Sequence, residues 1–121
     1  MISQFIIIQY HPTIYEAVNL GIVVYDNNGG VRHFFTHEYS RAAVMSGGED
    51  MAFINEYVLG VEKSLDTYGI EYVEKLTKKF YQGVFGATPP KTSLDSLDAT
   101  LDAMKTACFP ADSSTVRASL S

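Results

Sequence analysis

Five residues near the start of the chain have the side chains of a small polar binding site. They are two tyrosines, a glutamate, an asparagine and a glycine: Tyr10, Glu16, Asn19, Gly21 and Tyr25. Phenol, carboxylate and amide groups hold a ligand by hydrogen bonds, and a glycine inside a strand lets another group approach the backbone closely. These residues are our candidate ligand-binding or partner-binding site. In the structural alternative, which we favour, Asn19 bonds a neighbouring segment, Glu16 forms a cap or salt bridge, and Gly21 accommodates a large aromatic ring.

The histidines are the first residues to consider for a metal site. His33 and His37 are four residues apart, a spacing that aligns two metal ligands on one face of a helix. Here the segment between them is rich in strand-forming residues, so the two side chains would not share a face in this way. Glu16 or Glu38 would have to supply a third ligand. We predict neither a metal ion nor another cofactor.

The sequence contains no recognisable catalytic motif. It has no GxSxG, GxGxxG or GxxxxGK pattern, and the glycine-rich residues 26–30 precede a β-rich segment rather than a helix that could bind phosphate. The single cysteine, Cys108, lies on the apolar side of a predicted helix, where a thiol behaves as a small hydrophobic group. We therefore favour a non-catalytic function.

Composition and charge exclude several classes of protein. The 121 residues carry nine Lys and Arg against fourteen Asp and Glu, a net charge of −5 that argues against binding to a nucleic-acid backbone. No apolar run approaches the roughly 20 residues of a membrane span. One cysteine permits no internal disulfide, and the first residues lack the basic segment of a signal peptide, so we expect a cytoplasmic protein.

Two features point to interaction with other proteins. The chain has eight Tyr and seven Phe but no Trp, and tyrosine is enriched in protein interfaces. Four tyrosines exceed the needs of one small core, and we expect some of them in an exposed patch: Tyr39, Tyr57, Tyr72 and Tyr81. A run of acidic residues also shares one face of the last predicted helix: Asp95, Asp98 and Asp102. Such a face could mimic nucleic-acid phosphates, although a solvated helix surface is the simpler interpretation.

Strands are predicted in the first third of the chain. Residues 4–10 form the first predicted strand, and the unbroken apolar run at 5–8 indicates a central strand covered on both faces or one with a face at a partner surface. The proline after His11 should end this strand. In the second strand, alternation predicts one apolar face: Val18, Leu20, Ile22 and Val24. The other face would contain Asn19, Gly21, Val23 and Tyr25. Residues 26–30 are rich in Asn and Gly, so we predict a β-hairpin that leads into a third strand at 31–36.

The second half of the chain is predicted to be mainly helical. A short helix is expected at 39–45, followed by a longer one from Glu49 to a stop at Gly69. Its inward side chains recur at steps of three and four: Ile54, Val58, Val61, Leu65 and Tyr68. A second helical stretch follows, with Val73, Leu76 and Phe80 directed inward. We favour a strand over a helix at 80–86 because of its glycines and aromatic residues.

The last helix is predicted over residues 95–109, with Ser93 as its N-cap and Pro110 as its stop. Its apolar stripe consists of Leu94, Leu97, Leu101, Met104 and Cys108. A stripe of this kind most often packs in the core of its own chain, but it is also compatible with a dimer interface.

Residues 10–26, YHPTIYEAVNLGIVVYD, resemble domain-of-unknown-function family 3037, a group of small bacterial and phage proteins. The matching positions are Tyr10, Pro12, Glu16, Asn19 and Gly21. Gln9 stands where the family usually has an arginine, and residues 14–16 replace its Arg-Gly-Glu, so an anion bound through those arginines is not expected here. The resemblance implies no reaction. Because genes of the family often lie beside those of HipA-like kinases, it suggests a protein partner.

We therefore predict an α+β fold. An antiparallel sheet of three to four strands comes from the N-terminal half, and helices from the second half pack on one face of it. Residues 1–110 would form one domain and 111–121 a flexible C-terminal tail. The expected function is a non-catalytic interaction module that binds a protein partner or a second copy of itself. The alternatives are a small-ligand or nucleotide-processing domain with a pocket near Tyr10, Glu16 and Asn19, and an acidic inhibitor of a nucleic-acid-binding protein.

Overall fold

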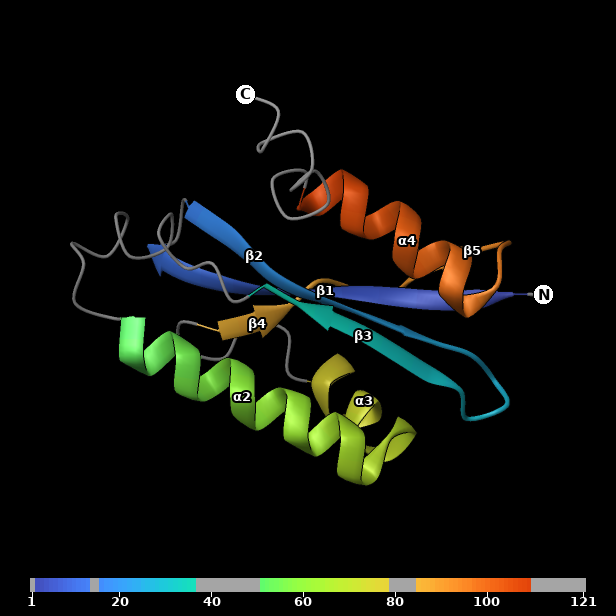
Figure 1. Ribbon diagram of the computed structural model, residues 1–121, viewed down its shortest axis with the longest axis horizontal. Coiled ribbons are helices and arrows are strands. Elements are labelled where there is room, and N and C mark those ends of the chain that lie inside the picture. Colours follow the sequence, from blue (N-terminus) through green and yellow to red (C-terminus); the bar gives the residue numbers. More distant parts are fainter. Residues whose placement is uncertain (1, 14–15, 37–50, 79–84, 110–121) are drawn as a thin grey trace, which may run out of the picture.

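The computed structural model describes residues 2–13, 16–36, 51–78 and 85–109, and it confirms the α+β class (Figure 1). The strands are β1 (Ser3–Thr13), β2 (Glu16–Tyr25), β3 (Val31–Phe35), β4 (Phe85–Ala87) and β5 (Lys91–Ser93). The helices are α2 (Met51–Tyr68), α3 (Ile70–Thr77) and α4 (Leu97–Cys108). The predictions for residues 39–45, for Phe80 and for the tail at 111–121 fall outside the described residues.

The strands form one antiparallel sheet in the order β3-β2-β1-β4, and the short β5 also pairs with β1. The apolar β1 is therefore a central strand, as one of the two interpretations of its sequence expected. It does not end before Pro12 but continues to Thr13, and its pairing with β2 is irregular between Tyr10 and Thr13. A proline cannot donate a hydrogen bond to a neighbouring strand, so it is tolerated at such an irregularity.

A β-bulge divides β2 into two parts. Ile8 pairs with Gly21, but the next residue of β1, Gln9, pairs with Asn19, so Leu20 is an extra residue on β2. An extra residue shifts the alternation by one, and every later side chain points to the face opposite to the one that simple alternation gives. The bulge therefore controls which side chains of β2 enter which core.

The predicted faces of β2 are wrong because of this bulge. Leu20 packs in a buried cluster on one side of the sheet, together with Val23. Ile22 and Val24 belong to a second buried cluster on the other side. No local sequence signal marks the shift, since all four residues are apolar and β-compatible.

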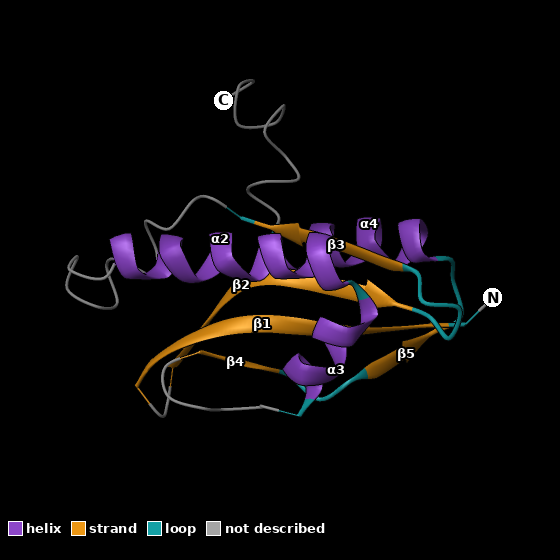
Figure 2. Ribbon diagram, turned by 90° about the horizontal axis from the view of Figure 1, so that it is seen from below, coloured by secondary structure: helices purple, strands orange, loops and turns teal. Residues whose placement is uncertain are grey.

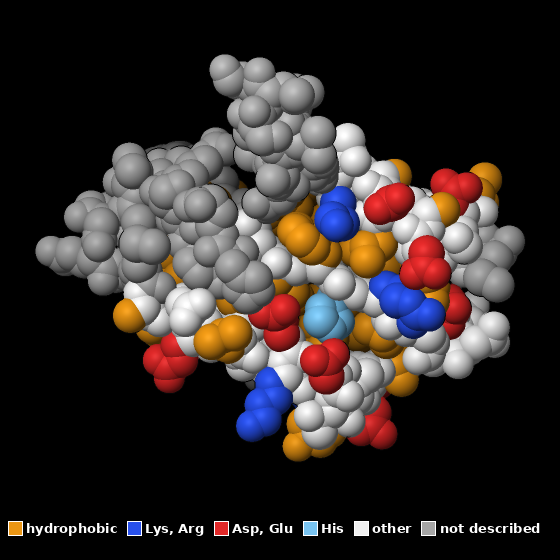
Figure 3. All heavy atoms as spheres, viewed as in Figure 1, with side chains coloured by type: hydrophobic (Ala, Val, Ile, Leu, Met, Phe, Trp, Pro, Cys, Tyr) orange, Lys and Arg blue, Asp and Glu red, His pale blue; other side chains and the backbone are white. Residues whose placement is uncertain are grey.

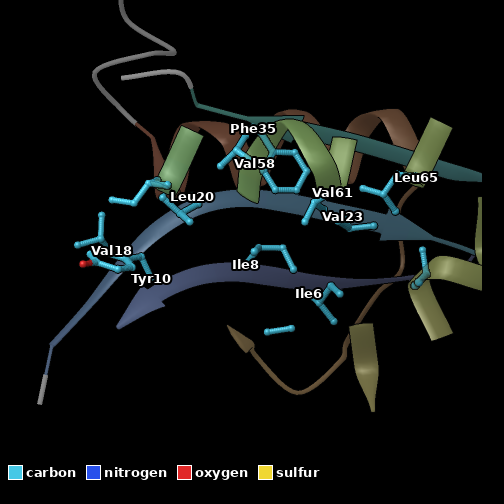
Figure 4. Close-up of a cluster of buried hydrophobic side chains, with 13 residues drawn as sticks. Ile6, Ile8, Tyr10, Val18, Leu20, Val23, Phe35, Val58, Val61 and Leu65 are labelled. Atoms are coloured by element: carbon cyan, nitrogen blue, oxygen red, sulfur yellow. The ribbon is translucent and has the colours of Figure 1, made fainter. Parts of the chain in front are cut away.

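Helices cover both faces of the sheet, and the prediction that they all pack on one face is wrong. Figure 1 shows α2 and α3 on one side of the strands and α4 on the other, and Figure 2 shows α2 and α3 from below. Successive side chains of β1 point to opposite faces of the sheet and so belong to different buried clusters. Ile6 and Ile8 lie in the cluster on the α2 side, and Phe5 packs against the cluster on the α4 side. Figure 4 shows the first cluster gathered between the strands and α2.

Helix α2 packs on the sheet through the stripe that its periodicity predicted. Its buried residues are Ile54, Val58, Val61 and Leu65. Tyr68, which we also expected inside, is 60% exposed. Gly69 has a positive φ of 57°, and its N–H donates to the carbonyl oxygen of Leu65, so it ends the helix as predicted.

The N-cap of helix α4 lies three residues later than predicted. The hydroxyl of Ser96, not Ser93, accepts a hydrogen bond from the N–H of Ala99 at 3.2 Å. Leu94 precedes the helix and is 79% exposed, so its predicted place in the apolar stripe is wrong. The rest of the stripe lies against the sheet, with Leu97 buried and three half-buried side chains packed beside it: Leu101, Met104 and Cys108.

The predicted hairpin between β2 and β3 is confirmed. The Asp26 carboxylate accepts hydrogen bonds from the N–H groups of Asn28 and Gly30, each at 2.9 Å. Gly29 has a φ of 82°, a conformation that side chains with a Cβ rarely adopt. The turn residues thus close the hairpin through local bonds, which explains why their sequence was sufficient to predict it.

Candidate functional site

The structure does not bring all five predicted site residues together. The side chain of Tyr10 is buried in the cluster beneath α2. Asn19 lies on the opposite face of the sheet, where its side-chain oxygen Oδ1 accepts a hydrogen bond from Nε2 of Gln9 at 2.9 Å. Glu16 begins β2, and its side chain lies outside the part of the chain that the structure describes. Tyr10 and Asn19 therefore cannot contact one ligand within the same cavity.

Gly21 and Tyr25 lie on the α2 side of the sheet. A Cβ atom on Gly21 would collide with the ring of Phe35, its partner on β3. The space above the glycine is thus filled by an aromatic ring, as the structural alternative expected. Tyr25 is half-buried and packs against the same core, and burial raises the pKa of its phenol.

A groove beside α2 brings together aromatic side chains from three elements. It has a volume of about 470 Å³, and its described lining consists of Phe53, Glu56, Tyr57, Gly60, Val61, Ser64, Tyr72 and Phe85. The lining includes Tyr57 and Tyr72, two of the four tyrosines expected at an interaction surface. The other two, Tyr39 and Tyr81, fall outside the described residues.

Phe85 of β4 is the centre of this aromatic group. Its ring stacks on that of Tyr57 with centroids 3.8 Å apart and planes 5° from parallel. Phe53 approaches Phe85 at 5.3 Å, and Tyr10 approaches it from the core at 5.6 Å. These contacts join the four rings into one cluster, and aromatic pairs of this kind contribute about 0.5–1.5 kcal/mol beyond their buried area.

The described lining of the groove contains one acidic residue, Glu56, and no basic residue. Burial, and secondarily the nearby Tyr72, raises the pKa of Tyr57 to about 12, so this phenol stays neutral at physiological pH. The carboxylate of Glu56 makes no hydrogen bond or ion pair with any described residue, and its side chain is exposed. The groove therefore combines neutral aromatic rings with one carboxylate that has no partner among the described residues.

The sequence contains a signal for this groove that our prediction missed. Phe53, Tyr57, Gly60 and Ser64 recur at steps of four, three and four along α2, next to the buried stripe. Two large aromatic residues followed by two small ones on one helix face indicate a groove, because the small side chains leave space beside the rings. Phe85 is far away in sequence, and only the position of β4 beside β1 places it there.

A second cleft, between the hairpin and the end of α2, contains a hydrogen bond between a histidine and an aspartate. Nε2 of His33 lies 3.0 Å from the carboxylate of Asp66, and the pair bridges β3 and α2. Within residues 2–13, 16–36, 51–78 and 85–109, no three His, Cys, Asp or Glu side chains gather closely enough to hold a metal ion. His37 and Glu38, the other members of the hypothetical metal site, lie outside these residues.

The last helix offers neither a nucleophile nor an uninterrupted acidic surface. Burial raises the pKa of the Cys108 thiol, the opposite of what a nucleophilic cysteine needs. Asp98 is paired with Arg32 at 3.2 Å, and Lys105 lies over the ring of Phe34 at 4.5 Å. Figure 3 shows basic and acidic side chains interspersed on this face of the molecule.

No protein-family model matches the chain, and no curated protein or solved structure matches it either. The resemblance of residues 10–26 to domain-of-unknown-function family 3037 thus stays a prediction. None of the described helices is both long and apolar enough to cross a membrane.

Proposed function

We propose that this chain is a non-catalytic protein-interaction module and that a partner protein binds in the aromatic groove beside α2. The observation that carries the proposal is the position of Phe53. Its ring is held against Phe85 at 5.3 Å, yet its side chain is 52% exposed. When a partner covers the exposed part of such a large apolar side chain, the free energy falls by roughly 25 cal/mol per Å² of apolar surface buried.

The other lining residues support binding rather than catalysis. Tyr57 and Tyr72 present phenols that combine apolar contact area with a hydroxyl group, a combination enriched at interfaces. Because Tyr57 stacks on Phe85, the surface is ordered before a partner arrives, and less conformational entropy is lost on binding. A HipA-like kinase, the partner type suggested by the family resemblance, is one candidate to test.

The test compares two substitutions on the same helix. Phe53 and Leu59 are 52% and 50% exposed, but only Phe53 lines the groove. The purified protein is mixed with a lysate of its own host and analysed by size exclusion with light scattering. We expect a defined complex for the wild type and for Leu59→Ser, and its loss for Phe53→Ser. A complex that survives Phe53→Ser would contradict the proposal.

A further inference from the structure

We infer that the groove beside α2 recognises a cationic side chain, in the first place an arginine, on an exposed segment of the partner protein. This inference rests on the proposed function and specifies the chemistry of the partner. The arginine would lie against the aromatic rings of the groove with its guanidinium directed to the carboxylate of Glu56.

The first support is the charge of the groove. Glu56 makes no ion pair with any described residue, and the described lining contains no Lys or Arg. A carboxylate beside apolar rings loses part of its hydration when a partner covers the groove, so an uncharged partner would leave it unpaired at a cost. A cation removes that cost. The net charge of −5 further favours the approach of a basic segment.

The second support is the aromatic content of the groove. Ring faces attract cations within about 6 Å, and arginine also stacks on them through its planar guanidinium. The same molecule contains one such contact, in which the ammonium of Lys105 lies 4.5 Å from the centre of the Phe34 ring. In the groove, Phe53 is the ring with the largest accessible surface, and it lies one helical turn from Tyr57.

The third support is the set of hydrogen-bond acceptors. Besides Glu56, the lining includes three residues that carry a hydroxyl group, Ser64, Tyr57 and Tyr72. A guanidinium has five N–H donors in a planar fork, whereas an ammonium has three donors at one point. Acceptors distributed along the groove therefore suit arginine better than lysine.

The experiment uses N-acetylarginine amide as the probe and N-acetylcitrulline amide as its uncharged control of nearly the same shape. Binding is followed by NMR through the ring protons of Phe53, Tyr57 and Phe85. We expect saturable shifts with the arginine probe and binding at least about tenfold weaker with citrulline, a difference of about 1.4 kcal/mol. Equal shifts with the two probes, or no shifts, would overturn the inference.

Glu56→Gln tests the role of the carboxylate, and Glu71→Gln is the matched control because Glu71 is exposed on α3 and does not line the groove. We expect Glu56→Gln to weaken arginine binding about tenfold and Glu71→Gln to preserve it. Equal effects of the two substitutions would contradict the assignment of Glu56.

The failures of the two proposals are distinguishable. If the partner complex is lost with Phe53→Ser but the wild type does not discriminate arginine from citrulline, the interaction module stands and the cation inference fails. If arginine binds through Glu56 but the complex survives Phe53→Ser, the cation site stands and the proposed function fails.

Discussion

The two faces of the sheet are covered in different ways. On the face of α2 and α3, a large apolar cluster continues into an aromatic groove whose rim contains the half-exposed Phe53. On the face of α4, the apolar cluster is smaller, and polar side chains around it bond to each other. There the hydroxyl of Thr100 lies 3.1 Å from that of Ser3 and 2.8 Å from that of Ser93.

This difference indicates which face is suited to binding. On the α4 side, Arg32 pairs with Asp98, and Lys105 lies over Phe34, so these two cations already have partners within the chain. On the α2 side, the groove presents apolar area and the carboxylate of Glu56, which pairs with no described residue, above a well-packed core. A binding site needs this combination of a well-packed core and surface groups that are still available to contact a partner.

The largest expected effect is a difference in stability between the two cores. Leu65→Ala, in the α2-side cluster at 3% exposure, should cost about 2–5 kcal/mol. Leu97→Ala, in the α4-side cluster at 8% exposure, should cost less because fewer buried neighbours surround the lost side chain. Urea unfolding of the two variants measures both values. A larger cost for Leu97→Ala would reverse the comparison.

The packing of Gly21 gives the next effect. Gly21→Ala should destabilise the protein by about 1–3 kcal/mol, because the new Cβ collides with the buried ring of Phe35. Gly60→Ala is the control, since the space around Gly60 is open and alanine favours a helix interior by about 0.5–1 kcal/mol. The two substitutions should therefore have opposite signs in thermal or urea unfolding. A neutral Gly21→Ala would show that the Phe35 ring can move.

The pH dependence of stability tests how well the back of the groove excludes water. Burial raises the pKa of Tyr57 from 10.0 to about 12. Between these pH values the unfolded chain loses a proton that the folded chain keeps. The contribution of Tyr57 to the free energy of unfolding is therefore fully present below pH 10 and is lost as the pH rises towards 12. The slope from this group is at most about 1.4 kcal/mol per pH unit.

Tyr57→Phe should remove this part of the alkaline slope in urea unfolding measured across that range. Tyr68→Phe is the matched control, because Tyr68 is on the same helix and 60% exposed. It should keep the wild-type profile. An unchanged slope in Tyr57→Phe would show that water reaches the phenol.

The smallest effect concerns the hydroxyl cluster on the α4 side. Thr100→Val keeps the shape of the side chain but removes the hydroxyl that bonds Ser3 and Ser93. We expect a loss of about 1 kcal/mol, because each serine keeps another partner in the Asp95 backbone. Urea unfolding again provides the value. An unchanged free energy of unfolding would mean that these hydrogen bonds do not stabilise the α4 side.

The predictions succeeded where short-range effects dominate. The Asp26 carboxylate and Gly29 are sufficient to form the hairpin turn, and the spacing of Ile54 and Val58 is sufficient to define the buried side of α2. They failed at Leu94, which has the right spacing for the α4 stripe but precedes the cap at Ser96. Ser93 and Ser96 are both good N-caps by residue type. Because Ser93 pairs with Ser3 in the sheet, the helix begins after Ser96 instead.

The sequence by itself determined the α+β class, the turn and the inward side of α2, because each depends on residues close together in the chain. For β1 it left two interpretations open, and pairing with the distant β4 decided between them. Only the tertiary structure decided the bulge at Leu20, the placement of α4 on the second face, and the stacking of Phe85 on Tyr57. These features depend on which apolar surfaces meet, and many pairings of similar apolar residues satisfy the same local pattern. The candidate groove belongs to this second group, since its rings come from α2, α3 and β4.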